Sequence, residues 1–220
     1  MINIAIDGPA GAGKSTIAKA VAARKNYIYV DTGAMYRAMA LFILRKGIDP
    51  DDAEGISNTC GEADISIEYR DGAQVVLLGG ENVNDKIRTP KVSDMASRTS
   101  VNGDVRRKLV ELQQKLAREQ NVVMDGRDIG TVVLPDARVK IYLTASVDVR
   151  ADRRYKELIE KGEEADLDEI RDQIRERDER DMNRDISPLR QADDAVLVDT
   201  SDLTIDEVAD KILAIIDEKI

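Results

Sequence analysis

The stretch Gly8-Pro9-Ala10-Gly11-Ala12-Gly13-Lys14-Ser15 matches the phosphate-loop pattern G-x-x-x-x-G-K-[ST] at every defined position. The alternating isoleucines of Ile2–Ile6 before it predict a strand, and the good helix formers of Ser15–Arg24 after it predict a helix. A glycine loop in this setting turns its backbone N–H groups inward, beside the positive end of the helix. The pattern therefore predicts a nucleotide phosphate cradle, in which Lys14 reaches the outer phosphates and Ser15 holds Mg²⁺. A plain glycine turn is the alternative.

The amino-acid composition limits which kinds of catalysis this protein can carry out. The 220 residues include no histidine and one cysteine, Cys60, and the net charge is −10. Without histidine, Ser-His-Asp and Cys-His catalysis are excluded and a zinc site is disfavoured, which leaves carboxylates, Lys, Arg and a hard metal ion. That inventory suits phosphoryl transfer, and the acidic balance disfavours a nucleic-acid partner.

Composition also bears on location and assembly. No apolar run approaches the roughly 20 residues that span a bilayer, and the sequence shows no secretory signal. With a single cysteine as well, we expect a cytoplasmic protein without a membrane partner. We expect a monomer, because no coiled-coil stripe is evident.

Apolar runs and helical segments alternate along the chain. This alternation predicts an α/β fold, a P-loop NTPase-type parallel five-stranded sheet with helices on both faces. The predicted strands are Ile2–Ile6, Tyr27–Asp31, Val122–Asp125, Val139–Leu143 and Val196–Asp199. A last helix is expected over Ile205–Lys219, capped by Asp202 or Thr204.

One segment breaks the alternation. The residues of Asp64–Arg70 and Val75–Leu78 flank Asp71-Gly72, which predicts a small antiparallel hairpin. We expect a β-containing insertion at about 61–90, followed by helices through Arg118.

Three segments bring arginine and aspartate to places where a second phosphate would bind. In Asp31–Arg37, Thr32 is expected to cap a helix and Arg37 to lie one turn inside it. In Val122–Asp128, the strand ends at Asp125, where a Mg²⁺-side carboxylate is expected, and Arg127 and Asp128 follow. In the third segment, charged residues share one face of a predicted helix: Arg177, Arg180, Asp181 and Arg184. A solvated, salt-bridged face is the alternative for this helix.

Five segments together resemble bacterial-type cytidylate kinases, nucleoside monophosphate kinases with a P-loop. They are GPAGAGKST, DTGAMYR, the IRT of Ile87–Thr89, MDGRDIGTVVLPDA and RDERDMNRDISPL, and the resemblance runs nearly end to end. It implies transfer of the γ-phosphoryl group of ATP to CMP or dCMP with Mg²⁺. It also implies a core (residues 1–36, 112–148 and 165–220), a monophosphate-binding region (37–111) and a lid (149–164).

The resemblance also implies the roles of individual residues. ATP would be held by Gly8, Pro9, Ala10, Gly11, Ala12, Gly13, Lys14, Ser15, Thr16, Arg153 and Arg154. CMP would be held by Asp31, Thr32, Arg37, Ser97, Arg106, Arg127, Asp128, Asp181 and Arg184. In this set Ser97, Arg106 and Asp128 would bind the cytosine and Asp181 the sugar. The catalytic residues would be Lys14, Asp125, Arg127 and Arg184, with Ser15 and Asp125 holding Mg²⁺ mostly through water.

Two alternatives stay open on the sequence. Another small-molecule P-loop kinase would share the phosphate loop, but the residues assigned to cytosine argue against it. A nucleotide-controlled switch or binding module would leave the arginines Arg37, Arg127 and Arg184 unexplained. The N-K-x-D motif of guanine-specific switches is also missing from the sequence.

Overall fold

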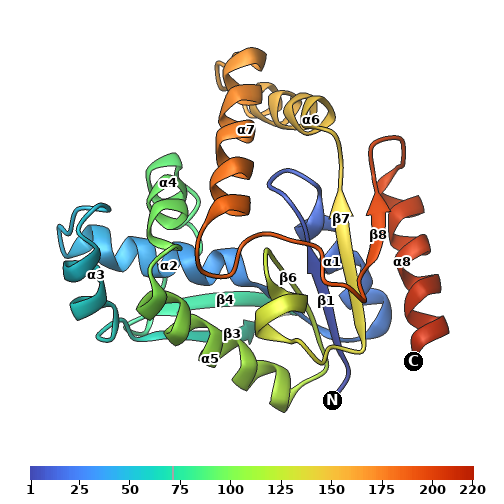
Figure 1. Cartoon of the computed structure of the whole chain (residues 1–220), viewed down its shortest axis with the longest axis horizontal. Coiled ribbons are helices and arrows are strands. Elements are labelled where there is room, and N and C mark those ends of the chain that lie inside the picture. The colour runs from blue at the N-terminus through green and yellow to red at the C-terminus, as the bar shows by residue number, and fades with distance from the viewer. Residues whose placement is uncertain (71) are drawn as a thin grey trace. The chain divides into compact units, whose positions relative to one another are not determined.

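The computed structural model describes residues 1–70 and 72–220 (Figure 1). The chain divides into two compact units, one of residues 28–122 with Met1 and one of residues 2–27 and 123–220. The strands are β1 (Asn3–Asp7), β2 (Ile28–Asp31), β3 (Ile65–Arg70), β4 (Ala73–Leu78), β5 (Glu81–Asn82), β6 (Val122–Gly126), β7 (Val139–Thr144) and β8 (Val196–Asp199). The α-helices are α1 (Lys14–Lys25), α2 (Thr32–Arg45), α3 (Ala53–Cys60), α4 (Pro90–Thr99), α5 (Gly103–Glu119), α6 (Val147–Glu160), α7 (Leu167–Asn183) and α8 (Ile205–Lys219). Residues Ile129–Val133 form a π-helix.

The larger sheet has five strands in the order β2-β6-β1-β7-β8. β1 pairs with β7 in parallel, with Ile4 opposite Val139, and β7 pairs with β8 in parallel. Ile4, Ala5 and Ile6 are all fully buried, as a strand covered on both faces requires. The predicted parallel five-stranded sheet is therefore confirmed, with every strand within two residues of its predicted bounds.

The helices of the second unit pack through aliphatic side chains. α1 contacts α8, whose Val208, Ile212 and Ile216 are buried. Thr204 caps α8 in a capping box with Glu207, which decides between the two predicted caps. α6 and α7 lie side by side in Figure 1, around a cluster of three buried residues, Ala151, Ile170 and Ile174.

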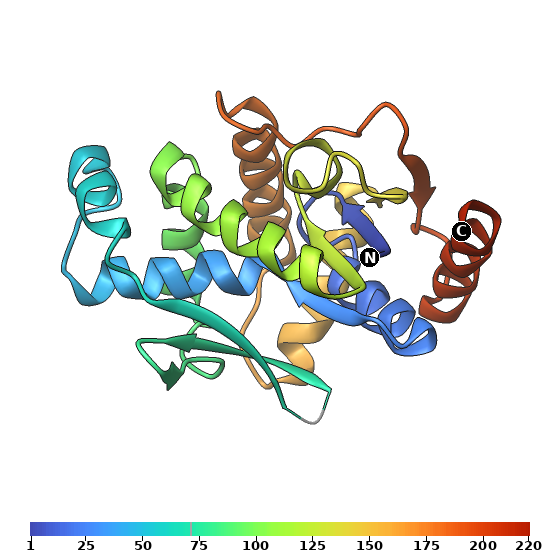
Figure 2. The ribbon, with the colours of Figure 1, turned by 90° about the horizontal axis from the view of Figure 1, so that it is seen from below.

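The first unit contains the predicted hairpin. β3 and β4 are antiparallel, from Ile65 opposite Leu78 to Arg70 opposite Ala73, and β5 extends this second sheet. Of the predicted turn, Gly72 has a positive φ of 75°, while Asp71 lies outside the described residues. α2 lies against this hairpin, as Figure 2 shows. The hairpin and the helices α4 and α5 were predicted, whereas α3 was not.

No helix formed by residues 1–70 and 72–220 is long and apolar enough to span a membrane. The predicted bounds of core, monophosphate-binding region and lid stay predictions.

Candidate active site

The phosphate loop leaves β1 and enters α1 at Lys14. Gly8 has a φ of +149°, and a Cβ atom at this position would lie 1.9 Å from the carbonyl oxygen of Leu143 in β7. Only glycine therefore allows the loop to leave β1 so close to β7. Gly13, directly before α1, is left-handed with a φ of +83°. Strand, glycine loop and helix thus follow one another as predicted.

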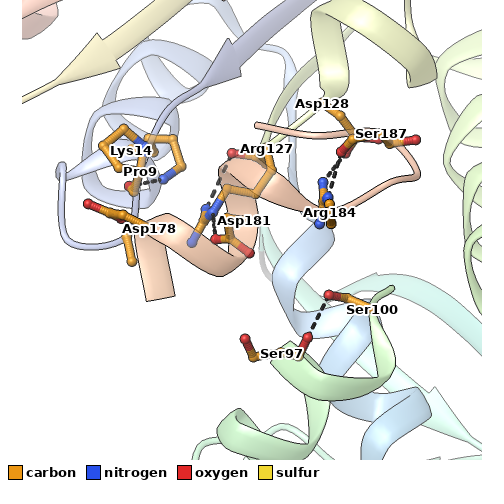
Figure 3. Close-up of polar contacts among 12 residues, drawn as sticks. Pro9, Lys14, Ser97, Ser100, Arg127, Asp128, Asp178, Asp181, Arg184 and Ser187 are labelled. Carbon is orange, nitrogen blue, oxygen red and sulfur yellow. Dashed lines mark hydrogen bonds and ion pairs between the residues drawn. The ribbon is translucent and has the colours of Figure 1, made fainter. Parts of the chain in front are cut away.

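Lys14 is buried at the start of this helix. Its ammonium group donates a hydrogen bond to the carbonyl oxygen of Pro9 at 2.7 Å, as seen in Figure 3. Burial and then the positive charge of Arg127 hold the pKa of Lys14 well below its ordinary value, although Asp125 opposes this shift. A charged Lys14 therefore needs additional negative charge nearby, and a phosphate group is a ligand that supplies it.

Ser15 and Asp125 lie next to each other, as their predicted roles require. The Ser15 hydroxyl donates to a carboxylate oxygen of Asp125 at 2.9 Å. Asp125 is buried on β6, the strand beside β1. One carboxylate and one hydroxyl form a set of oxygen atoms typical of Mg²⁺ held together with nucleotide phosphates and water. These two residues therefore fit the metal that the resemblance implies.

Arg127 and Asp181 form an ion pair, with Nε of Arg127 2.8 Å from a carboxylate oxygen of Asp181 (Figure 3). Burial alone would raise the pKa of Asp181 and lower that of Arg127. Their mutual attraction outweighs burial, so the pKa of Asp181 is lowered and that of Arg127 is raised. Both groups are therefore held in their charged forms, and α7 fixes the direction of the guanidinium.

Arg184 is the first residue after α7, and it lies near Asp128. Its side chain is 3.8 Å from the carboxylate of Asp128, and its Nε donates to the carbonyl oxygen of Ser187 at 2.6 Å. Both partners of the ion pair are buried. The four predicted residues Arg127, Asp128, Asp181 and Arg184 therefore form two charge pairs within the second unit.

In the first unit, Asp31 and Arg37 form a third pair. One carboxylate oxygen of Asp31 accepts the N–H of Ala34, and the other lies 3.1 Å from the Arg37 guanidinium. Asp31 is thus the cap of α2, and Thr32 is its first residue. The prediction that Thr32 caps this helix is wrong, because the carboxylate one residue earlier accepts the N–H group of Ala34 in the first turn.

Arg106 is a buried arginine of α5, also in the first unit. It donates to the carbonyl oxygen of Ser100 at 3.2 Å, and its guanidinium carbon lies 5.5 Å from the ring centre of Tyr36. Ser100 in turn donates through its hydroxyl to the carbonyl oxygen of Ser97 (Figure 3). The last turn of α4 and the first turn of α5 therefore hold Ser97 and Arg106 through Ser100.

Arg153 and Arg154, the two arginines predicted to hold ATP, contact other residues of the chain. Arg153 donates to the hydroxyl and carbonyl oxygens of Thr200, after β8, at 3.1 and 2.6 Å. Arg154 is exposed and pairs with Glu157. Their role in binding ATP stays a prediction.

Arg150, which was predicted only as one of the arginines that start the helix of the lid, lies beside the phosphate loop. It donates to the carbonyl oxygen of Ala10 at 2.9 Å and forms an ion pair with Asp178 of α7 at 2.6 Å. Its side chain is only 4% exposed, as is that of Arg184. From the sequence, only the position of Arg150 near the start of the helix after β7 could have indicated that it lies near the phosphate loop.

Asp7, the last residue of β1, was also missed. Its two carboxylate oxygens accept the backbone N–H groups of Ile129 and Gly130 at 2.8 and 2.7 Å. Burial raises the pKa of Asp7 to about 6, although both hydrogen bonds oppose the shift. An aspartate before a phosphate loop carries no recognisable pattern, because its partners lie 122 and 123 residues away.

The shifted pKa of Asp7 predicts a pH dependence of stability. The folded protein binds this proton more tightly than the unfolded chain, since the pKa rises from 3.8 to about 6 on folding. The contribution of Asp7 to the free energy of unfolding should therefore fall as pH rises from about 4 to 6, by roughly 3 kcal/mol, and stay level above. Urea unfolding of the ligand-free protein and of Asp7→Asn at several pH values measures this. A difference between the two proteins that does not change with pH would contradict it.

A phosphate loop on a parallel sheet, together with its neighbouring aspartate and several buried arginines, places the chain among the P-loop kinases. The fold agrees with a shikimate kinase from Bacteroides thetaiotaomicron, with a TM-score of 0.52 at 14% identity over 98% of both chains. The model of the family described as cytidylate kinase matches residues 4–218, and the chain therefore belongs to the cytidylate kinase family.

Curated relatives agree with this assignment. A cytidylate kinase of Caldicellulosiruptor saccharolyticus is 53% identical over 212 residues, covering 96% of this chain and 94% of the relative. A cytidylate kinase of Bacillus licheniformis is 50% identical over 217 residues, covering 98% and 96%. The similarity thus extends over nearly the whole length of each protein.

Proposed function

We propose that this protein transfers the γ-phosphoryl group of ATP to CMP and dCMP, yielding CDP and dCDP. The observation that carries the proposal is the segment Asp125–Asp128 at the end of β6. In this segment a carboxylate lies against the phosphate-loop serine, and two and three residues later come the arginine and the carboxylate that we assign to a second nucleotide. Relatives named cytidylate kinase at about half identity over the full length support this choice of acceptor.

For the donor, we assign the loop Gly8–Thr16 to the phosphates of ATP, with Lys14 at the outer phosphates. Mg²⁺, when bound, would neutralise charge on these phosphates, and Ser15 and Asp125 would hold it, mostly through water. Arg153 and Arg154 of the proposed lid (residues 149–164) would leave their present partners to reach ATP. The exposed pair of Arg154 with Glu157 costs little to break, because such pairs contribute about 0–1 kcal/mol.

For the acceptor, we assign Arg37, Arg127 and Arg184 to the phosphate of CMP, beside Asp31 and Thr32. Each of these arginines already lies beside a carboxylate or carbonyl oxygen, which fixes the position of its guanidinium. We assign Ser97, Arg106 and Asp128 to the cytosine and Asp181 to the sugar. A carboxylate suits the exocyclic amino group of cytosine, and uracil would leave that carboxylate unpaired, which makes discrimination strong.

The reaction then needs positioning and charge neutralisation more than proton transfer. The acceptor phosphate is already an anion, so a strong general base is unnecessary. Arginines between the two phosphates offset their repulsion and stabilise the charge on the transferring group. Closure of a lid would exclude water, which would otherwise accept the phosphoryl group.

A substrate panel tests the proposal. With ATP and Mg²⁺, we expect CMP and dCMP to be phosphorylated with far higher kcat/KM than UMP or AMP, because base recognition rests on hydrogen bonds to the cytosine. Formation of the nucleoside diphosphate is followed by chromatography. Equal or better use of AMP would refute the assignment to cytidylate. Slow ATP hydrolysis that no acceptor accelerates would favour a nucleotide-controlled switch.

A further inference from the structure

The carboxylate of Asp7 joins the phosphate-loop strand to the segment that carries Arg127 and Asp128. Asp7 is 5% exposed, and its two oxygens each accept one N–H group, from Ile129 and from Gly130. We propose that Asp7 is a positioning residue of the phosphoryl transfer, which holds Arg127 and Asp128 at a fixed place beside the phosphate loop. This inference rests on the proposed function.

The two N–H groups are those that most need an external partner. Ile129 and Gly130 begin the π-helix, and the first N–H groups of any helix lack an intrahelical acceptor. π-Helical turns are rare and occur often at functional sites. Asp7 supplies both acceptors, so it determines where this turn starts, directly after Asp128.

On the side of Gly130 and Thr131, few other contacts hold the π-helical turn in place. Gly130 and Thr131 border a hollow of about 370 Å³, which the side chain of Lys140 also lines. The buried hydroxyl of Thr131 has no hydrogen-bond partner among the described residues. The turn therefore borders open space on that side, and the hydrogen bonds to Asp7 carry more of the task of fixing it.

Asp7 is next in the sequence to the loop assigned to ATP, and its hydrogen-bond partners are close in the sequence to the arginine assigned to CMP. Gly8, the next residue, begins the loop assigned to ATP, and Ile129 lies two residues after Arg127. One carboxylate thus couples the donor loop to the acceptor arginine. A misplacement of about 1 Å in such a site costs on the order of 100-fold in rate.

Asp7→Asn is the direct test, because asparagine offers one acceptor oxygen and turns an N–H₂ donor toward the second N–H group. We expect kcat/KM for CMP to fall about 10- to 100-fold and the preference for CMP over UMP to shrink, while the Kd for ATP stays close to that of the wild type. Hydrogen exchange at the amides of Ile129 and Gly130 should accelerate, with exchange in α8 unchanged.

Two further variants separate the role of the Asp7 carboxylate from general effects of mutation in this unit. Gly130→Ala keeps the carboxylate and introduces a Cβ atom 3.4 Å from Asp7 Oδ2, an ordinary contact, and 3.1 Å from Lys140 Cδ, which the flexible lysine can relieve, so a much smaller loss than that of Asp7→Asn is expected. Val208→Ala opens a cavity under α8 in the same unit and reports the effect of lost stability alone.

The outcomes separate the two proposals. A wild-type protein that does not phosphorylate CMP would refute the proposed function. A wild type active on CMP, with Asp7→Asn within twofold of it or no more impaired than Gly130→Ala or Val208→Ala, would overturn the role of Asp7 alone. A loss confined to ATP binding would overturn it too.

Discussion

Replacing Arg127 with alanine is expected to lower kcat for CMP phosphorylation by about 10³-fold, the lower end of what an arginine at a transferring phosphoryl group contributes. The ion pair with Asp181 holds this guanidinium in one direction, and the raised pKa of Arg127 keeps it charged. A preorganised charge stabilises the transition state without the cost of reorienting water. Arg127 therefore contributes where charge develops, and less to the ground-state binding of ATP.

Steady-state kinetics and ATP titration of the Arg127→Ala variant measure the two effects separately. Arg127→Lys keeps the charge but loses the forked donors, and it should fall between alanine and the wild type. Arg175→Ala is the matched control, since Arg175 is an exposed arginine of α7 paired with Asp172. Near-normal turnover of Arg127→Ala would remove Arg127 from the chemistry. An equal loss of ATP affinity and turnover would assign it to the donor instead.

The parts of the fold set by neighbouring residues were predictable from the sequence. The phosphate loop, the five strands and the hairpin depend on local spacing, and the structure has each of them where the pattern indicated. The cap of α2 shows where local patterns become ambiguous. Asp31 and Thr32 are both good caps in adjacent positions, and only the geometry of the turn selects the aspartate.

The partners of the charged side chains were not predictable. Arg127 and Asp181 were each assigned to a ligand, and their pairing with each other depends on how α7 packs. Asp7 was missed, and Arg150 was predicted only as part of a lid, because their partners are distant along the chain: Asp7 and Ile129 are 122 residues apart, and Arg150 and Ala10 are 140 apart. The π-helix was missed as well, since five residues carry no periodic pattern.

Removing one partner of the buried pair of Arg150 and Asp178 should cost more stability than removing one partner of an exposed ion pair of the second unit. Arg150 lies between three elements: it contacts the phosphate loop through Ala10, the end of β7 through Ala145, and α7 through Asp178. One oxygen of Asp178 is buried without a hydrogen-bond partner among the described residues, so its carboxylate depends on this arginine. Removal of one partner of such a pair leaves an uncompensated buried charge.

Arg150→Met should therefore lower the free energy of unfolding by about 3–5 kcal/mol, measured by urea denaturation. The double variant Arg150→Met/Asp178→Leu should recover much of this loss, because it removes both charges and keeps apolar volume. Arg154→Ala is the control on the same helix, since its exposed pair with Glu157 should contribute at most about 1 kcal/mol. An Arg150→Met variant as stable as Arg154→Ala would show that water reaches the pair. A double variant no more stable than Arg150→Met would instead assign the loss to the hydrogen bonds with Ala10 and Ala145, and Arg150 would then act mainly on the phosphate loop.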